Sequence, residues 1–196
     1  MINEILSLAL TCAPYISPEA LTQIIRVESA GNIYAIGING RNKLPRQPKN
    51  KEEAYATFEY LHAQRIAFGA GIMQIDSQHH RRLGWGANPE KAFNVCENLT
   101  TGHNIFTDCY NRAVLKGFSQ SLENNIIVPS NSSNSAYTRA LSCYNTGGFN
   151  YGFQNGYVNK AITLIKRETS KGENRSSLIS SNSAPKRNKV ISSSII

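Results

Sequence analysis

The feature that most constrains the fold is a long stretch of helical periodicity in the second half of the chain. Apolar or small residues recur there at alternating intervals of four and three positions, at Val95, Leu99, Gly102, Phe106, Cys109 and Ala113. This spacing places them on one face of an α-helix. We therefore predict a long helix that faces the core.

The predicted helix limits how the four cysteines can pair. Cys96 and Cys109 would lie at its two ends, about 20 Å apart at about 1.5 Å per residue, too far for a disulfide. Two pairings remain open: Cys12 with Cys96 and Cys109 with Cys143, or Cys12 with Cys109 and Cys96 with Cys143. Four buried free thiols are the alternative, because free cysteine packs well as a small hydrophobic residue.

Composition narrows the class of protein. The 196 residues suggest one main domain, and the 40% hydrophobic content is typical of a globular chain. No run of about 18 apolar residues occurs, so we do not expect an integral membrane protein. The net charge of +8 suggests an acidic partner. Because no nucleic-acid-binding motif accompanies this charge, we do not expect a nucleic-acid partner. The cysteines form no C-x-x-C pair and the histidines lack further ligands, so we expect no metal or cofactor.

A second helix is predicted just after the N-terminal segment, and both of its ends are marked. Ser17 can cap its first turn, Pro18 suits the first helical position, and Glu19 favours the positive end of the helix dipole. Gly31 is expected to end it.

One face of this second helix carries an unexpected carboxylate. Leu21, Ile24 and Ile25 share that face, and Glu28 is the next residue on it. Burial would raise the pKa of Glu28 and make it a proton donor near neutral pH, so Glu28 is the candidate general acid. The alternative is a glutamate at the rim of the helix, in solvent or paired with Arg26 or another arginine.

The next segments predict a small β element and another helix. Asn39-Gly40, with apolar residues alternating around it, predicts a hairpin or an extended loop. Asn50 and Glu53 predict the start of a helix that ends near 67–69. Its inner face is expected to comprise Ala54, Phe58, Leu61, Tyr55 and Arg65.

A glycine-flanked apolar run at 69–76 predicts a buried strand or turn, in which the Gln74 amide must find partners. Ser77 can cap a short basic segment at 78–83, where we interpret His79 and His80 as surface or cleft residues. Residues 119–135 are rich in Ser and Asn, which predicts an exposed excursion with a short extended piece.

Two further helices are predicted near the end of the domain. One carries Tyr137, Leu141, Tyr144 and Asn145 and stops at 147–148, and the last begins near Tyr157. From about residue 168 the chain is Ser-rich and aperiodic, so we predict one domain over 1–167 and a mobile, disordered basic tail over 168–196.

Four motifs in order resemble those of the soluble lytic transglycosylase and goose-type lysozyme superfamily. They are E-S-A-G-N at 28–32, G-I-M-Q-I at 71–75, S-C-Y-N-T-G at 142–147 and Y-V at 157–158. The C-A-P at 12–14 and the insert before G-I-M-Q-I most resemble the specialised lytic transglycosylases of type IV secretion and conjugation systems. The resemblance covers roughly residues 10 to 166, and four motifs in one order are specific where each alone is weak.

The resemblance implies a lysozyme-like α+β fold, mainly helical with a small β-hairpin element. It also implies cleavage of the β-1,4 bond between N-acetylmuramic acid and N-acetylglucosamine in peptidoglycan, without a cofactor. Glu28 resembles the catalytic acid and base of the family, and Ser29 the residue beside it. The other implied residues would line the glycan cleft or hold the glycan or the carboxyl: Gly71, Met73, Gln74, Asp76, Tyr144, Asn145 and Tyr157.

The implied mechanism needs one essential carboxyl group. Glu28 would protonate the glycosidic oxygen and then deprotonate the muramoyl C6 hydroxyl, giving a 1,6-anhydro product. Asp76 stands where many lytic transglycosylases have Asn and goose-type lysozymes have Asp. It could position a water for hydrolysis, or cap the following helix.

The resemblance also implies partners and a location. Peptidoglycan strands would be the substrate, components of a secretion or conjugation machine the partners, and the periplasm or cell envelope the location. The N-terminal stretch has no Lys or Arg before its apolar core and carries Glu4, so it is a poor match to a secretory signal. A non-catalytic peptidoglycan-binding scaffold with the same fold is a further alternative.

Overall fold

The computed structural model describes residues 7–8, 10–40 and 43–163. The chain divides into two units, Met1–Leu164 and Ile165–Ile196. The predicted tail at 168–196 falls in the second unit and lies outside the described residues. Among the described residues, no helix is both long enough and apolar enough to cross a membrane.

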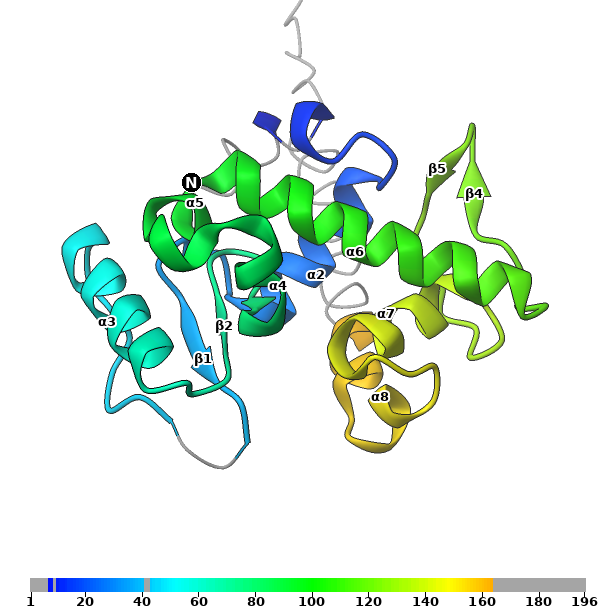
Figure 1. Ribbon diagram of the computed structural model, residues 1–196. Helices are drawn as coiled ribbons and strands as arrows, with labels where there is room; N and C mark the ends of the chain where they lie inside the picture. The colour runs from blue at the N-terminus through cyan, green and yellow to red at the C-terminus, as the bar shows by residue number, and fades with distance from the viewer. Residues whose placement is uncertain (1–6, 9, 41–42, 164–196) are drawn as a thin grey trace, which may run out of the picture. The chain divides into compact units, whose positions relative to one another are not determined.

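The long helix α6 (Val95–Leu115) runs through the middle of the described unit (Figure 1). It packs along α7 (Ala136–Thr146) and also contacts α5 (Pro89–Phe93). The predicted inner face is confirmed, since Leu99, Gly102, Phe106, Cys109 and Ala113 are all buried.

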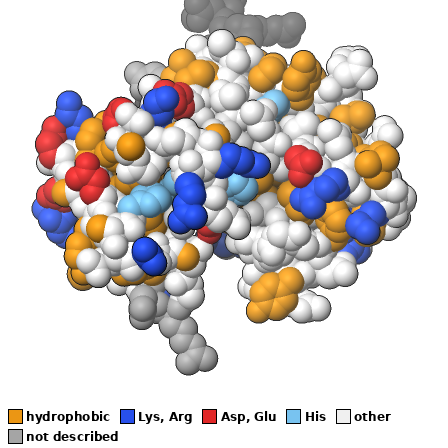
Figure 2. Space-filling view, in the orientation of Figure 1, with side chains coloured by type: hydrophobic (Ala, Val, Ile, Leu, Met, Phe, Trp, Pro, Cys, Tyr) orange, Lys and Arg blue, Asp and Glu red, His pale blue; other side chains and the backbone are white. Residues whose placement is uncertain are grey.

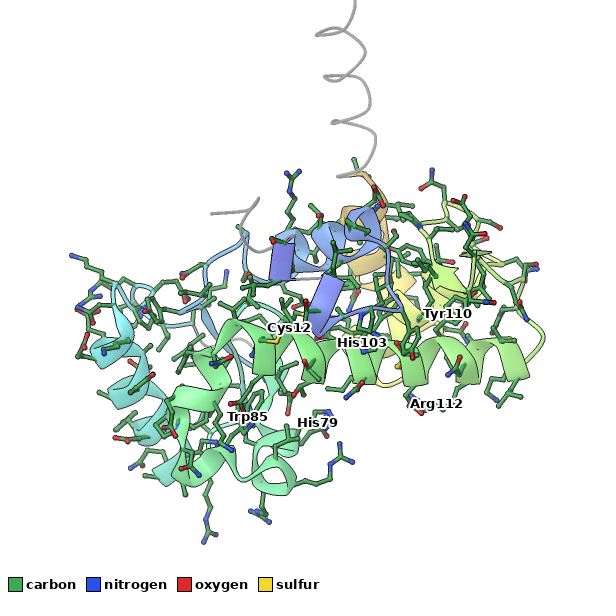
Figure 3. The ribbon with its side chains drawn as sticks, turned by 90° about the horizontal axis from the view of Figure 1, so that it is seen from above. Cys12, His79, Trp85, His103, Tyr110 and Arg112 are labelled. Atoms are coloured by element: carbon green, nitrogen blue, oxygen red, sulfur yellow. A yellow bond between two sulfur atoms is a disulfide. The ribbon has the colours of Figure 1, made fainter. Side chains whose placement is uncertain are left out.

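Two disulfides fix segments against α6. Cys12 is bonded to Cys96, which ties the N-terminal segment to the first turn of α6, and Figure 3 shows Cys12 lying against this helix. Cys109 is bonded to Cys143, which joins α6 to α7. This is one of the two pairings that the helix geometry left open.

The β element is a three-stranded antiparallel sheet of β1 (Ile36–Ile38), β2 (Phe68–Ala70) and β3 (Ile75–Asp76) in the order β1-β2-β3. Of the hairpin and the extended loop predicted around Asn39-Gly40, the described residues favour the loop, because β1 pairs with β2, with Ile38 opposite Phe68. On the other edge of β1, the Gln47 side chain both accepts from the backbone N–H and donates to the backbone carbonyl of Ile36, each at 2.8 Å. A single amide thus takes the place of a neighbouring strand at this position.

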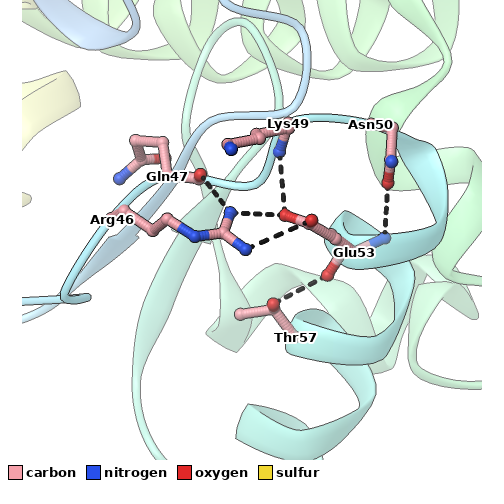
Figure 4. Close-up of polar contacts among 6 residues, drawn as sticks. All are labelled: Arg46, Gln47, Lys49, Asn50, Glu53 and Thr57. Atoms are coloured by element: carbon pink, nitrogen blue, oxygen red, sulfur yellow. Dashed lines mark hydrogen bonds and ion pairs between the residues drawn. The ribbon is translucent and has the colours of Figure 1, made fainter.

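Helix α3 (Lys51–Ala63) begins as predicted, because the Asn50 side chain accepts a hydrogen bond from the backbone N–H of Glu53 (Figure 4). Glu53 itself accepts from the backbone N–H of Lys49 and pairs with Arg46. The helix ends earlier than predicted, since Arg65 adopts a left-handed conformation with φ 55°. Arg65 is exposed, so its assignment to the inner face is wrong.

Helix α4 (Ser77–Leu83) corrects two predictions. Its cap is Asp76, whose side chain accepts from the backbone N–H of Gln78, and not Ser77. His80 is fully buried between the rings of Phe58 and Trp85. It is therefore a core residue, because its imidazole stacks in an aromatic cluster rather than facing solvent.

The remaining elements include the predicted N-terminal and C-terminal helices and short elements that were not predicted. Helix α2 (Pro18–Glu28) is capped by Ser17, whose backbone N–H bonds to Ile127 in β5 (Ile126–Ile127). That strand pairs with β4 (Leu122–Glu123) in the Ser- and Asn-rich excursion. Helix η1 (Trp85–Ala87) follows α4, α8 (Tyr151–Gln154) follows α7, and residues 157–163 are helical. The architecture is therefore α+β and mainly helical, as predicted.

Candidate active site

Glu28 is the last residue of α2, and its helix face is buried as predicted: Leu21, Ile24 and Ile25 are all in the core. The Tyr157 hydroxyl donates a hydrogen bond to the Glu28 Oε1 atom. Burial raises the pKa of Glu28 to about 7, although the Tyr157 hydrogen bond and the positive charge of Lys160 act in the opposite direction. Glu28 can therefore both give and take a proton near neutral pH.

Glu28 opens into a pocket of about 330 Å³ between the sheet and α7. Four of the residues expected at the site from the sequence line it together with Glu28: Gln74, Asp76, Tyr144 and Asn145. The rest of the wall is formed by residues in β1, just after it and in β2: Gly37, Ile38, Asn39, Gly40 and Gly69. The sequence did not indicate that these residues belong to the site.

Ser29 and Tyr144 both bind the tight turn that joins β2 to β3. The Ser29 hydroxyl donates to the Ile72 carbonyl at 2.7 Å, and the Tyr144 hydroxyl donates to the Met73 carbonyl at 2.8 Å. Each hydroxyl proton is therefore directed at the backbone. The two residues connect the end of α2 and the last turn of α7 to one turn, which fixes the two sides of the pocket relative to each other.

Gly71 and Met73, which the sequence placed in the cleft, are buried, and neither lines this pocket. Gly71 has φ +79°, and a Cβ atom on it would lie 2.2 Å from the Asn98 side-chain nitrogen. Met73 packs against Gly102 in α6, where a Cβ atom would lie 2.5 Å from the methionine sulfur. Both residues let the turn sit tightly on α6.

Asn98 holds this turn, and no sequence motif indicated it. The side chain is buried, accepts from the Met73 N–H at 2.8 Å, and donates to the carbonyls of Ala70 and Ala92 at 3.0 and 2.8 Å. The helical spacing could have indicated Asn98, because it lies three residues after Val95 on the predicted apolar face. A polar residue on such a face needs a partner in the core.

Gln74 finds the partners that its position requires. It has φ +49°, and its amide nitrogen donates to the carbonyls of Ala35 and Gly71 at 2.9 and 2.8 Å. Its side-chain oxygen lies beside Gly37 in the wall of the pocket. The amide is thus anchored through its nitrogen, and its oxygen can accept a hydrogen bond from a ligand.

Asp76 is held by two hydrogen bonds. One oxygen caps α4, and the other accepts from the Asn39 side-chain nitrogen at 2.6 Å. Its role as a cap, one of the two predicted for it, is confirmed. Among the described residues, no cluster of three or more histidines, cysteines or carboxylates could hold a metal ion.

Asn145 lies at the rim of the pocket and contacts the loop that carries Tyr157. Its side-chain oxygen accepts from the Asn155 amide at 2.9 Å, and the Asn155 oxygen accepts from the Tyr157 backbone N–H at 3.0 Å. Asn155 therefore connects two residues of the site, and no sequence motif indicated it.

Comparison with known proteins identifies the family. The model of the transglycosylase SLT domain matches residues 6–165. The type IV secretion system protein virB1 of Brucella abortus biovar 1 (strain 9-941) is 35% identical over 162 residues, which cover 80% of this chain and 62% of that protein. Protein virB1 of Agrobacterium fabrum (strain C58) is 29% identical over 164 residues, covering 84% and 60%. No solved structure matches.

The chain thus spans about three-fifths of the length of these relatives. The family model covers most of the described residues, including all four motifs from Glu28 to Tyr157. This confirms the resemblance found in the sequence: the chain belongs to the transglycosylase SLT domain family.

Proposed function

We propose that this chain is a peptidoglycan lytic transglycosylase. It cleaves the β-1,4 bond between N-acetylmuramic acid and N-acetylglucosamine and releases a 1,6-anhydro product. The observation that carries the proposal is Glu28, whose carboxyl group lines the pocket and has its pKa raised to about 7 by burial. At pH 7 a group with this pKa is about half protonated, so one residue can act as acid and then as base.

In the first step, protonated Glu28 donates its proton to the glycosidic oxygen as the bond to the muramoyl anomeric carbon breaks. Tyr157 donates to Oε1, which leaves the other carboxyl oxygen to carry the proton. The acetamido group of the substrate stabilises the positive charge that develops at the anomeric carbon. The Tyr157 hydrogen bond stabilises the glutamate that this step leaves behind.

In the second step, ionised Glu28 accepts the proton of the muramoyl C6 hydroxyl. The C6 oxygen bonds to the anomeric carbon and closes the anhydro ring, and Glu28 regains the proton that it gave in the first step. No water is consumed. The reaction therefore proceeds without the second catalytic carboxylate of most glycosidases.

Hydrolysis with Asp76 as a second acid is the alternative that the sequence raised, and it is not favoured. Both Asp76 oxygens already accept hydrogen bonds, from Asn39 and from the first turn of α4. A carboxylate held in this way serves mainly to cap the helix and not to position a catalytic water. The non-catalytic scaffold is not favoured either, since it gives no reason for a carboxyl group to be buried beside Tyr157.

We further propose that the enzyme opens the wall for a type IV secretion machine in the periplasm. The support is the name of the Brucella relative, a type IV secretion system protein. Two disulfides agree with an oxidising compartment, which the periplasm is. The net charge of +8 suits a wall rich in peptide carboxylates.

The test is digestion of purified peptidoglycan by the wild type and by Glu28→Gln, followed by mass analysis of the products. Lytic transglycosylation predicts muropeptides about 18 Da lighter than their reducing-end counterparts, because ring closure replaces the addition of water. We expect these products from the wild type and none from Glu28→Gln.

Glu19→Gln is the matched control, since Glu19 is an exposed glutamate on the same helix. It should leave the anhydro products unchanged. Reducing-end products from the wild type would identify a hydrolase instead. A folded wild type that yields no products would contradict enzymatic function altogether.

A further inference from the structure

A second and larger pocket, of about 760 Å³, adjoins the candidate active site. It shares two lining residues, Asn39 and Asp76, with the pocket that contains Glu28. Its other walls come from α3, from the loop that follows α3, from α4 and from η1: His62, Arg65, Ile66, Ala67, Ser77, Gln78, Arg81 and Gly86. A chain bound at Glu28 could therefore extend a branch into this second pocket without leaving the surface.

Two arginines reach this pocket from different elements. Arg65 follows α3 and Arg81 lies in α4, and both are exposed. Within the described residues, neither guanidinium forms an ion pair or a side-chain hydrogen bond. Figure 2 shows Lys and Arg side chains close to His side chains near the middle of the viewed face. Two guanidinium groups without partners in one pocket can bind anions in the bidentate manner that carboxylates favour.

The pocket remains positive when its other titratable groups are included. Its carboxylate, Asp76, already accepts from Asn39 and from the backbone of α4. The pKa of His62 is lowered by burial and by the positive charge of Arg81, so His62 is mainly neutral at pH 7. The pocket thus contains two positively charged arginines and one carboxylate that is already hydrogen-bonded. Its net positive charge favours an acidic ligand.

The conformation of Arg65 is a second and independent observation. The backbone N–H of Ile66 bonds to the Leu61 carbonyl, and that of Arg65 bonds to the His62 carbonyl, each at 3.0 Å. This arrangement ends a helix with a left-handed residue at the position of Arg65, where glycine is preferred. Arg65 adopts it with φ 55°. Glycine would adopt this backbone conformation more easily than arginine. The presence of arginine there, in the wall of a pocket, therefore suggests that its side chain has a function.

We propose that Arg65 and Arg81 bind carboxylates of the peptide stems that branch from the glycan strand. The inference rests on the proposed function, because it places the glycan at Glu28 and the acidic branch in the adjoining pocket. Peptide stems are attached to the lactyl groups of muramic acid and carry free carboxylates. The pocket would therefore distinguish wall that still carries its peptides from bare glycan.

The test measures binding in the Glu28→Gln background, so that the wall is not digested during the experiment. Three forms of wall are compared: intact sacculi, sacculi whose carboxylates have been amidated, and glycan strands freed of peptides. Arg65→Gln with Arg81→Gln should weaken binding to intact sacculi roughly 5- to 30-fold, as expected for the loss of two exposed charged contacts. Binding to the other two forms should not change.

Lys51→Gln with Lys116→Gln is the matched control, because it removes the same charge from two exposed lysines outside both pockets. An equal loss in this control would show that net charge alone attracts the wall, and would overturn the proposal. An equal loss on peptide-free glycan would assign the arginines to the sugar chain, and would also overturn it.

Arg65→Gly separates binding from folding. Glycine suits the left-handed position, so the melting temperature should rise or stay the same while binding to intact sacculi falls several-fold. A lower melting temperature would give Arg65 a structural role and contradict our reasoning. Failure of the proposed function has a different readout, namely the absence of anhydro products from the wild type, which these binding measurements do not use.

Discussion

Asn98→Ala tests whether one buried amide holds the turn beneath the candidate active site. The substitution removes three hydrogen bonds, to the Met73 N–H and to the carbonyls of Ala70 and Ala92. Asn98 is only 1% exposed, so these backbone groups would lose their partners inside the core. At about 1–3 kcal/mol for each unpaired group, partly recovered where water enters, we expect unfolding to become easier by about 3–5 kcal/mol.

The same substitution should lower activity by more than the loss of folded protein explains. Ser29 and Tyr144 both bond to carbonyls of this turn, at Ile72 and Met73. A turn released from Asn98 would let both residues move. Because small displacements of positioned groups slow reactions strongly, we expect activity to fall even well below the melting temperature.

The measurement is unfolding by urea under oxidising conditions, with release of anhydro products assayed in parallel. Asn111→Ala is the control, since Asn111 is an exposed asparagine on the same helix. It should change the free energy of unfolding by less than about 0.5 kcal/mol. A loss below about 1 kcal/mol for Asn98→Ala, or full activity in that variant, would refute the reasoning.

Two further predictions concern the acid and the disulfides. Tyr157→Phe removes a hydrogen bond that lowers the pKa of Glu28, so this pKa should rise above about 7. Because the first step needs protonated Glu28, activity falls as pH rises through this pKa, and the variant's pH profile should fall at higher pH than that of the wild type. Reduction of both disulfides, which close loops with sequence separations of 84 and 34, should destabilise the fold by about 4 kcal/mol each, measured by urea unfolding with and without reductant. An unshifted profile or an unchanged urea midpoint would contradict these predictions.

The position of Glu28 could be predicted from the sequence because it depends on local geometry. Ser17 and Pro18 mark where the helix begins, and the spacing from Leu21 sets which residues face inward. A repeat of 3.6 residues per turn carries this information over the length of one helix. The same argument explains why α6 and the exclusion of a Cys96–Cys109 disulfide could be predicted.

The sheet could not be predicted in the same way, since its pairing is not local. The Asn39-Gly40 dipeptide favours a turn in any chain that contains it, but β1 pairs with β2 beyond α3. Among the described residues that follow this dipeptide, Gln47 hydrogen-bonds through its side chain to the Ile36 backbone in β1. Turn propensity is a local preference, and it does not specify which distant strand pairs with β1.

The packing of His80 and the exposure of Arg65 both differ from the prediction. Helix α3 ends at Ala63, before the predicted 67–69, and His80 packs against Phe58 of this helix and against Trp85. The backbone turn at Arg65 lets Phe68 enter the sheet and join the aromatic cluster around His80. A non-glycine residue in a left-handed conformation leaves no mark in the sequence, so neither result could be predicted.

The G-I-M-Q-I motif illustrates why a family pattern does not by itself assign roles. Gly71 leaves room for Asn98, and Met73 fills the space that Gly102 provides. Of the residues in the motif, only Gln74 lines the pocket that contains Glu28. A substitution at Gly71 would therefore abolish activity by disrupting the turn. A substitution at Gln74 would act by removing a group that contacts the ligand. Stability measurements distinguish the two, because only the buried position should also lower the free energy of unfolding strongly.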